Sequence, residues 1–387
     1  MNHYYVDLHI HIGRTFTGKA VKITGAKSLT FSSIIEHARK EKGLNMIGII
    51  DCHSPEVIIE IENLIQTEEL TEHPEGGVVF GDLMIIPGSE LEIYDEDCQG
   101  PIHVLCYFPT ISIMKEFSDW LSQYMKNNNL SSQRIYVSGR ELQKKVKEWS
   151  GLFIPAHVFT PFKSLYGKGV SQSLAEVLDP ELIDAIELGL SSDTYMADQI
   201  AELHHYSFVT NSDAHSLPKI AREYQVVAMK EPSFKELEKA LKQLDDRRII
   251  ANYGLDPLLG KYHQTVCASC QTSYSPEESK CPNCQDIKTV RGVADRILEL
   301  KTADGSPEHR PPYIHQVPLE FISGLGPKLL RKLLDHFGTE MAILHEVPEE
   351  ALKQVVPEKI AELIVKARNG ELDIQAGGGG KYGKIVD

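Results

Sequence analysis

Residues 1–260 alternate between short apolar runs and stretches with helical periodicity, and this alternation limits the possible folds more than any other feature. Seven runs are predicted strands, and they cover residues 4–10, 45–51, 78–88, 102–108, 151–157, 183–189 and 207–213. Helical patterns lie between many of them, and a final predicted helix covers 232–248. Near-continuous apolar strands that alternate with helices predict a parallel α/β domain, either a barrel or an open sheet.

Residue types that bind metals stand at or near the ends of these predicted strands. His9 and His11 are two residues apart, so their side chains leave an extended chain on the same side. The residues of this kind are Asp7, His9, His11, Asp51, Cys52, His53, Glu90, His103, His157, Asp213 and His215. Most stand at C-terminal strand ends, where the loops of a parallel α/β domain form active sites. Because imidazole and carboxylate groups bind zinc, manganese and iron, we predict two or three divalent metals with bridging carboxylates.

A single histidine in a strand is more often a packed or surface side chain than a metal ligand. Their succession at several strand ends favours a metal centre over this alternative. Glu187 also ends a predicted strand, and we expect it to have a structural or supporting role. His37, His204 and His205 lie on helical patterns, where we expect surface or packing positions.

Four of the seven cysteines form two C-x-x-C pairs separated by ten residues. They are Cys267, Cys270, Cys281 and Cys284. Two such pairs supply four thiolates in tetrahedral geometry, which predicts a zinc ribbon with one structural zinc. A redox dithiol is the alternative. Cys52, Cys98 and Cys106 are scattered, and an odd count argues against a disulfide framework.

The segment Phe321–Thr339 places a Gly-x-Gly-Pro turn before a leucine-rich helix. It resembles a helix-hairpin-helix DNA-binding module, with residues 355–370 as its degenerate second half. Backbone N–H groups at Gly324 and Gly326 would then meet a phosphate, with Lys328, Arg331 and Lys332 adding positive charge. A small helical oligomerisation module is the alternative.

The chain divides into five predicted parts. They are an α/β domain (1–255), a zinc ribbon (256–302), a linker (303–318), a helix-hairpin-helix region (319–370) and a flexible Gly-rich tail (371–387).

Net charge is −15, and −13 of it falls in residues 1–260. This argues against non-specific binding of nucleic acid by a broad positive face. Any affinity for DNA is therefore expected to come from local basic residues and bound metals. We find no apolar run of roughly eighteen residues and no signal-peptide pattern, so we predict a cytoplasmic protein without a membrane partner.

Residues 1–250 resemble the PHP domain family through "DLHIH", "DCHSP", "GSELEI", "IHVL", "PAH" and "SDAH". The resemblance implies a distorted (β/α)7 barrel with a two- or three-metal centre that hydrolyses phosphoesters. It assigns three ligand sets, namely His9, His11, Glu90 and Asp213; Glu90, His103 and His157; and His53 with His215, assisted by Asp51. The stretch "GRTFTGK" lacks a histidine that many family members carry, so the third set has the weakest support.

The order of barrel, ribbon and hairpin resembles the endonuclease Q family, as do "HVFTPFKSLYGKG" after His157 and "NYGLDPLLGKYHQTVCASC". The resemblance implies an endonuclease that hydrolyses DNA 5′ to uracil, hypoxanthine, xanthine or abasic sites. His9, His11, Glu90 and Asp213 would be its catalytic residues. Damaged DNA is the expected partner, together with the replication or repair machinery.

An enzyme of this kind must take the damaged nucleotide out of the stack. Phe159, Phe162, Lys163 and Tyr166 are our candidates for holding it or wedging the duplex. The alternative is that these aromatic rings simply pack the loop.

Two other functions fit parts of the chain. A small-molecule phosphoesterase of the histidinol-phosphatase type would explain the barrel but leave the ribbon and hairpin without a task. A non-catalytic DNA-binding protein with a vestigial PHP site would explain the ribbon and hairpin. The imidazole-rich ligand set favours zinc or manganese over magnesium, although metal availability decides.

Overall fold

The structure is a computed structural model, and it describes residues 1–260, 262–275, 277–372, 374–375 and 384–385. Three parallel neighbours form its centre: β1 (Asn2–Ile10), β2 (Met46–Ile49) and β5 (Leu83–Ile93). Next to β5 lie β6 (Ile102–Tyr107) and then β8 (Leu152–Pro155). The short strands β9 (Ile186–Glu187) and β10 (Phe208–Val209) pair in parallel.

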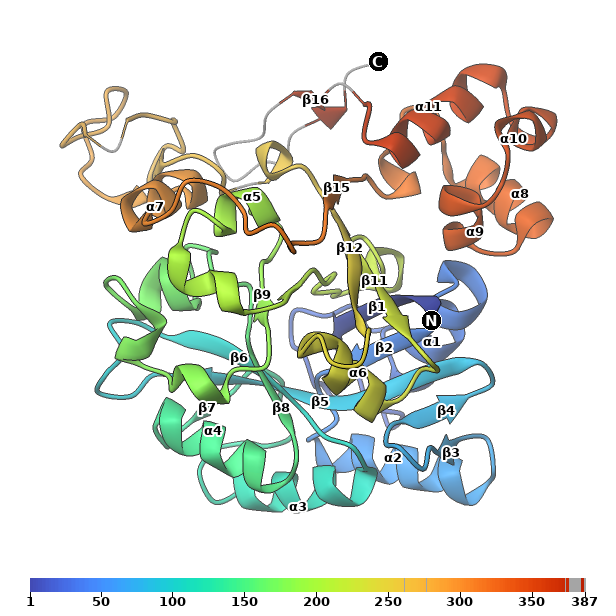
Figure 1. Cartoon of the computed structure of the whole chain (residues 1–387), viewed down its shortest axis with the longest axis horizontal. Coiled ribbons are helices and arrows are strands. Elements are labelled where there is room, and N and C mark those ends of the chain that lie inside the picture. Colours follow the sequence, from blue (N-terminus) through green and yellow to red (C-terminus); the bar gives the residue numbers. More distant parts are fainter. Residues whose placement is uncertain (261, 276, 373, 376–383, 386–387) are drawn as a thin grey trace.

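Backbone hydrogen bonds connect these strands into a ring. The N–H of Asp184 donates to Phe153 at 3.0 Å and links β8 to the chain entering β9. The N–H of Ala214 donates to His9 at 3.2 Å and links the chain after β10 to β1. The ring therefore contains β1, β2, β5, β6, β8, β9 and β10, and Figure 1 labels all of these strands except β10.

The parallel arrangement expected of the α/β domain does not extend to β6, which runs antiparallel to β5 and to β8. The reason is the connection, because residues 94–101 are too short for the crossover that parallel neighbours require. The run 78–88 is likewise two strands. It turns at Gly81, whose φ of +63° suits glycine, into the antiparallel pair β4 (Val78–Phe80) and β5.

Further strands extend the sheet on both sides of the ring. On one side, β11 (Tyr224–Met229) pairs antiparallel with β1 and with β12 (Arg248–Gly254), and β15 (Tyr313–His315) lies parallel to β12. On the other side, β3 (Thr71–Glu72) pairs with β4. The short strand β7 (Arg134–Ile135) pairs with the end of β5.

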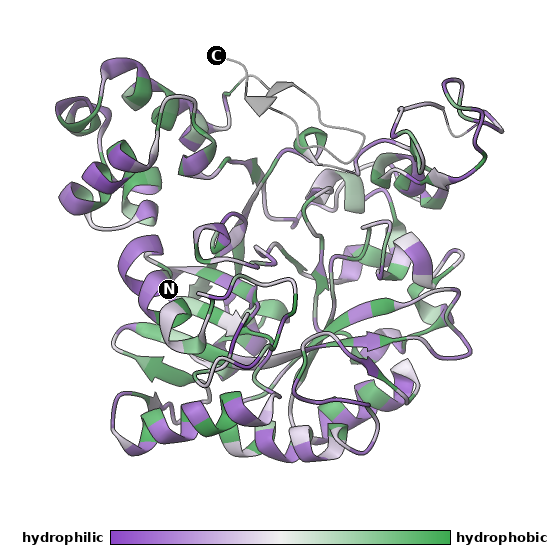
Figure 2. Ribbon diagram, turned by 180° about the vertical axis from the view of Figure 1, so that it is seen from behind, coloured by the Kyte–Doolittle hydropathy of each residue, from purple (hydrophilic) through white to green (hydrophobic). Residues whose placement is uncertain are grey.

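Helices cover the outside of the strands. They are α1 (Phe31–His37), α2 (Pro55–Gln66), α3 (Ile111–Leu121), α4 (Gly139–Glu148), α5 (Thr194–Ala197) and α6 (Phe234–Leu241). Thr110, Ser138 and Ser233 cap α3, α4 and α6 with their hydroxyl oxygens. The helix predicted over 232–248 is shorter than expected because Gln243, Asp245 and Asp246 adopt left-handed φ and end it. In Figure 2 the strands are largely hydrophobic, whereas α2, α3 and α4 alternate between hydrophobic and hydrophilic residues.

An apolar cluster draws residues from around the ring. Leu8, Met46, Ile86, Leu105 and Ile154 belong to it, and α6 contributes four more hydrophobic side chains. The hydroxyl of Tyr107 donates to the carbonyl of Leu8 at 2.6 Å within this cluster. The cluster is therefore an apolar base for the polar residues described below.

The remaining helices come from the C-terminal third. The strands β13 (Val266–Cys267) and β14 (Thr289–Val290) hold the cysteine segment and are followed by α7 (Val293–Leu300). Beyond β15 come α8 (Pro327–Phe337), α9 (Glu340–His345), α10 (Glu349–Val355) and α11 (Glu358–Asn369), grouped at one corner of the molecule (Figure 1). The pair β16 (Ile374–Gln375) and β17 (Lys384–Ile385) follows. The predicted flexible tail over 371–387 lies largely outside the described residues.

Candidate metal centre

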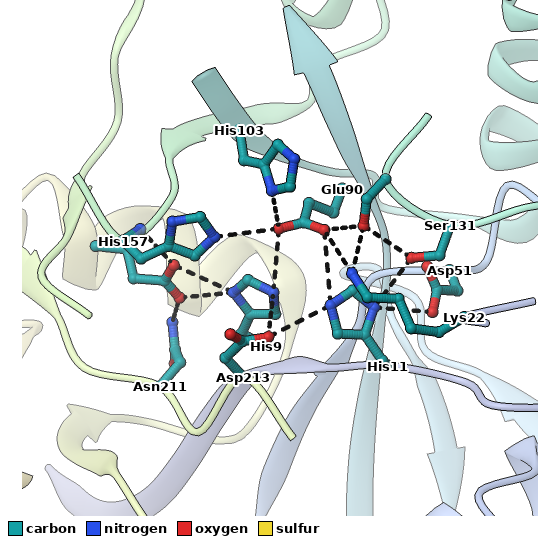
Figure 3. A network of polar contacts seen from close by, with 12 residues as sticks. His9, His11, Lys22, Asp51, Glu90, His103, Ser131, His157, Asn211 and Asp213 are labelled. Atoms are coloured by element: carbon teal, nitrogen blue, oxygen red, sulfur yellow. Dashed lines mark hydrogen bonds and ion pairs between the residues drawn. The ribbon is translucent and has the colours of Figure 1, made fainter. Parts of the chain in front are cut away.

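His9 of β1 and His11, just after this strand, turn the same ring nitrogen towards the centre of the site (Figure 3). Nδ1 of His9 lies 2.9 Å from Oε1 of Glu187. Nδ1 of His11 lies 3.1 Å from Oδ2 of Asp51 and 3.0 Å from Oγ of Ser131. With Nδ1 engaged, Nε2 of each ring is left free to face a metal. Glu187 contacts His9 and Asp51 contacts His11, and a supporting role for each stays a prediction.

Glu90, at 1 % exposure, lies between two groups of imidazoles. Its Oε1 is 2.9 Å from Nδ1 of His103 and 3.3 Å from Nε2 of His157. Its Oε1 lies 3.6 Å from Nε2 of His9, and its Oε2 lies 3.6 Å from Nε2 of His11. A carboxylate with imidazoles on both sides has the position of a bridging ligand.

His103 reaches this site for a reason that the sequence did not reveal. It is the second residue of β6, whereas most of the other candidates follow the ends of their strands. Because β6 is antiparallel, its N-terminal end lies at the rim where the parallel strands have their C-terminal ends. Glu92 of β5 is paired with His103 in the register, two residues after Glu90 and on the same face.

Asp213 closes the site from the segment after β10. Its Oδ1 lies 3.5 Å from Nε2 of His9, and 3.4 Å from Nε2 of both His11 and His215. Asp213 and His157 have φ angles of 44° and 30°, which residues other than glycine rarely adopt. Strain of this kind costs about 1–3 kcal/mol per residue and gathers at functional sites.

The third predicted ligand set, His53 with His215, is not brought together. Both ring nitrogens of His53 have other partners, the Ser89 hydroxyl at 2.8 Å and the Leu130 carbonyl at 3.3 Å. His215 instead joins His11 and Asp213. The strand β2 ends at Ile49, so His53 lies in the turn that follows it and not on the strand.

The donor set fits divalent metals. Nε2 of His9, His11, His103 and His215 is buried and has no hydrogen-bond partner among the described residues, a costly state unless another group binds it. Three sets have their ligand atoms within 4.8 Å of one another: His9–His11–Glu90, Glu90–His103–His157 and His11–Asp213–His215. Shared Glu90 and His11 make these sets one polynuclear arrangement.

The charges of the site keep its carboxyl groups ionised. Burial alone would raise the pKa of Glu90, but His103 and Lys22 hold it well below its usual range. Burial opposes ionisation of Asp213 as well, and the imidazoles of His11 and His215, each 3.4 Å from its Oδ1, hold its pKa well below the usual range. Both carboxylates are therefore negative and ready to bind cations at neutral pH.

Lys22 is a site residue that sequence reasoning missed. Its Nζ lies 3.3 Å from Oε2 of Glu90 and 2.6 Å from Oγ of Ser132, and its side chain is 15 % exposed. Ser132 itself donates to the same Glu90 oxygen. Nothing in the local sequence marks this lysine, because only the fold brings residues 22, 90 and 132 together.

A cavity of about 530 Å³ lies over the ligand cluster. Its apolar walls are Val21, Ile23, Leu130, Phe162, Leu190 and Tyr262. Of the four loop residues predicted to contact DNA, Phe162 and Lys163 line this cavity. Phe159 and Tyr166 do not line it, because they are buried and stack with ring centroids 5.4 Å apart. The packing alternative therefore describes that pair.

The four cysteines of the two C-x-x-C pairs come together with their sulfur atoms within 4.8 Å of one another. Each pair forms the same turn. The N–H of Gln271 donates to Cys267 and that of Gln285 to Cys281, and both glutamines have left-handed φ near 60°. This arrangement is consistent with a zinc ribbon that binds one structural zinc.

The residues of the C-terminal hairpin that are predicted to contact phosphate differ in how free their charges and backbone groups are. Gly324 has a φ of +80°, and Gly326 precedes α8, so the turn has the expected shape. Lys328 is exposed, but Arg331 pairs with Asp335 and Glu41. Lys332 donates to the carbonyl of Val355 at 2.6 Å, so its charge is used to join α8 to α10.

The fold and the ligand cluster define an α/β protein of the PHP class with a candidate polynuclear metal centre. A family described as PHP-associated matches residues 193–245. The uncharacterized protein YqxK of Bacillus subtilis is 58 % identical over 385 residues and spans the full length of both chains. The uncharacterized protein MJ0043 of Methanocaldococcus jannaschii is 40 % identical over 255 residues, which are 59 % of this chain and 31 % of that relative.

Two solved structures are similar over almost the whole chain. The lesion-specific endonuclease PfuEndoQ of Pyrococcus furiosus has a TM-score of 0.85 and 35 % identity, covering 99 % of this chain and 95 % of that one. Endonuclease Q in complex with a 27-mer duplex, with an abasic lesion at its active site, has a TM-score of 0.84 and 35 % identity, covering 99 % and 96 %. This chain belongs to the endonuclease Q family. Over its described residues, no helix is long and apolar enough to cross a membrane.

Proposed function

We propose that this protein is a metal-dependent DNA repair endonuclease that hydrolyses the phosphodiester bond 5′ to a deaminated base or an abasic site. Uracil, hypoxanthine and xanthine are the deaminated bases in question. The observation that carries the proposal is the Glu90-centred cluster beneath a cavity, in a chain that matches endonuclease Q structures over almost its full length. The complex with a lesion at the active site supports a substrate of this kind.

His9, His11, Glu90 and Asp213 would hold one metal, with His215 beside them. Glu90, His103 and His157 would hold a second. Zinc or manganese suits these ligands. Such ions, when bound, activate a water molecule for attack and neutralise the charge of the phosphate.

The other residues of the site position these ligands and shape the space above them. Glu187 holds His9, and Asp51 and Ser131 hold His11, so each ring presents Nε2. Lys22 and Lys163 line the cavity and can neutralise phosphate oxygens. The apolar walls, which include the half-exposed Phe162, would receive a nucleotide that has left the stack.

The test is cleavage of a duplex that carries one uracil, hypoxanthine or abasic site, with an undamaged duplex beside it. Zinc, manganese and magnesium are each added to metal-stripped protein. The variants are Asp213→Asn, which loses one carboxylate of the ligand cluster, and Asp246→Asn, at an exposed aspartate in the turn before β12. We expect a metal-dependent nick on the 5′ side of the lesion in the wild type and in Asp246→Asn only.

Other outcomes would support the alternatives. If the protein binds lesion duplex but nicks it with none of the three metals, the result would favour the non-catalytic protein. Turnover of a phosphomonoester without any DNA cleavage would favour the small-molecule phosphoesterase.

A further inference from the structure

A second cavity, of about 560 Å³, lies between the loop that follows His157 and the end of the cysteine segment. The barrel side contributes the loop Phe159–Ser171 and Gln99. The other side is formed by β14, Arg291 and α7. The cavity is thus enclosed by two parts of the chain that are more than one hundred residues apart.

The charge of this cavity differs from that of the chain as a whole. Its lining includes Lys168, Arg291 and Arg296, and no aspartate or glutamate. The chain carries −15 overall, so a cavity whose charged lining residues are all cations differs in sign from the chain as a whole. Lys168 is exposed and has no ion-pair partner among the described residues, which leaves its charge available to a ligand.

Arg296 gives the cavity a fixed shape. Its guanidinium donates to the carbonyls of Tyr166, Val170 and Ser171 at 2.8, 3.0 and 2.7 Å. These bonds fasten the barrel loop to α7, which holds the walls of the cavity together. Glu299, near the C-terminal end of α7, does not line the cavity but contacts both Arg291 and Arg296.

The second cavity adjoins the first through a shared residue. Phe162 lines both, and its ring meets Tyr262 edge-on with centroids 5.5 Å apart. A DNA strand with its scissile bond at Glu90 can therefore pass Phe162 and bring a neighbouring phosphate to the three cations. Lysine and arginine side chains are common contacts of backbone phosphates in complexes with nucleic acid.

We infer that this cavity binds a backbone phosphate of the DNA that the metal centre cuts, at a position next to the damaged nucleotide. Lys168 and Arg291 contact the phosphate oxygens, and Arg296 adds its positive charge while holding the loop. The inference rests on the proposed function, and it adds a second anchoring point that fixes the register of the strand on the enzyme.

The test measures binding of a duplex with one abasic site across a range of salt concentrations, with active-site metal omitted. Lys168→Ala, Arg291→Ala and the double variant are compared with the wild type. The control Lys144→Ala/Lys235→Ala also removes two positive charges, from exposed positions on α4 and α6 that do not line the cavity. Duplexes with one neutral methylphosphonate at each position near the lesion form the second arm.

We expect the double variant to bind about tenfold more weakly, with a slope of log K against log[salt] lower by about one, while the control keeps the wild-type slope. One methylphosphonate position should weaken wild-type binding and have no further effect on the double variant. Lys168→Ala removes an exposed side chain that has no ion-pair partner among the described residues, so it reports on binding even if Arg291→Ala folds poorly.

If the wild type binds and nicks lesion duplex and the variants keep the wild-type salt slope, this inference is overturned and the proposed function is left intact. Wild-type protein that does not bind the duplex would overturn both. Weakened binding of a free mononucleotide, with duplex binding unchanged, would assign the cavity to small phosphates and overturn the assignment to the DNA backbone.

Discussion

Single residues decide which nitrogen of each imidazole faces the centre of the site. The carboxylates of Glu187 and Asp51 occupy Nδ1 of His9 and His11, and therefore direct Nε2 inward. Supporting carboxylates of this kind commonly change metal affinity by about 10- to 100-fold when removed. The candidate centre thus depends on residues beyond its ligands.

Lys22 provides a sharp prediction at this scale. Replacing Lys22 with Met removes the cation beside Glu90 while keeping the length of the side chain. We expect kcat for lesion cleavage to fall on the order of 10²-fold, as when one donor to a developing charge is lost. Metal content, measured by mass spectrometry, should not change. Lys19→Met, at an exposed position, is the matched control. Wild-type kcat in Lys22→Met would contradict the prediction.

Glu223 is a buried carboxyl group with an unusual pH dependence. Its Oε1 accepts the N–H of Leu255 at 3.0 Å, and its Oε2 has no hydrogen-bond partner among the described residues. Burial raises the pKa of Glu223 to about 8. The folded state therefore holds this proton more tightly than the unfolded chain, so stability decreases as pH rises towards that value.

Replacing Glu223 with Gln should remove this pH dependence. Between about pH 6 and about pH 9 we expect the wild type to lose roughly 2 to 3 kcal/mol of unfolding free energy relative to Glu223→Gln. Urea unfolding of both proteins at the two pH values measures the difference. Parallel pH profiles would show that Glu223 is not protonated in the folded protein.

At the scale of elements, strand direction decides which residues meet. The antiparallel β6 brings His103 to the same rim as His157 and Asp213, although His103 begins its strand. The cysteine segment is a second case in which strand pairing decides which residues meet. Its strands β13 and β14 pair Cys267 with Thr289, and β14 also lines the second cavity. Metal binding in that segment is therefore connected to the shape of the barrel loop.

The cysteine segment should lose its metal and its order when one thiolate is removed. Cys281→Ser leaves three thiolates, and small zinc modules depend on the metal for folding. We expect the structural zinc to be lost and amide hydrogen exchange to rise over residues 262–292. The buried Cys98→Ser, which lies outside the cluster, is the control. Full zinc content in Cys281→Ser would contradict the prediction.

At the scale of the whole molecule, the C-terminal helices are joined to the barrel by buried contacts. Nζ of Lys42, after α1, lies 2.9 and 3.0 Å from the two oxygens of Glu340 in α9. The ring of His345 stacks on Tyr5 of β1 with centroids 4.9 Å apart. These contacts hold the helices that carry the hairpin in one orientation relative to β1.

Breaking the Lys42–Glu340 pair from one side should be costly. Lys42→Met leaves Glu340 buried without its cation, and removal of one partner from a buried pair costs about 3–5 kcal/mol. The double variant Lys42→Met/Glu340→Gln leaves no uncompensated charge, so we expect most of this loss to be recovered. Urea unfolding measures both. A single variant that loses less than about 1 kcal/mol would show that the pair is not buried in solution.

Sequence patterns predicted the regular parts of this protein well where the signal was local. The strands of β1 and β2 follow from apolar runs, and the cysteine pairs follow from their spacing. The predicted lengths of β9 and β10 were too long. Residues 183–189 and 207–213 are largely apolar because they are buried, but only two residues of each segment form a strand.

The sequence by itself determined which chemistry is available: imidazoles and carboxylates near strand ends, and four cysteines in two pairs. Local periodicity and spacing encode such features, since they involve residues a few positions apart. The tertiary structure alone decided that Glu187 holds His9, 178 positions away, that Lys22 reaches Glu90, and that the ring of His53 turns elsewhere. Those contacts depend on how strands are ordered and directed, and no local pattern specifies them.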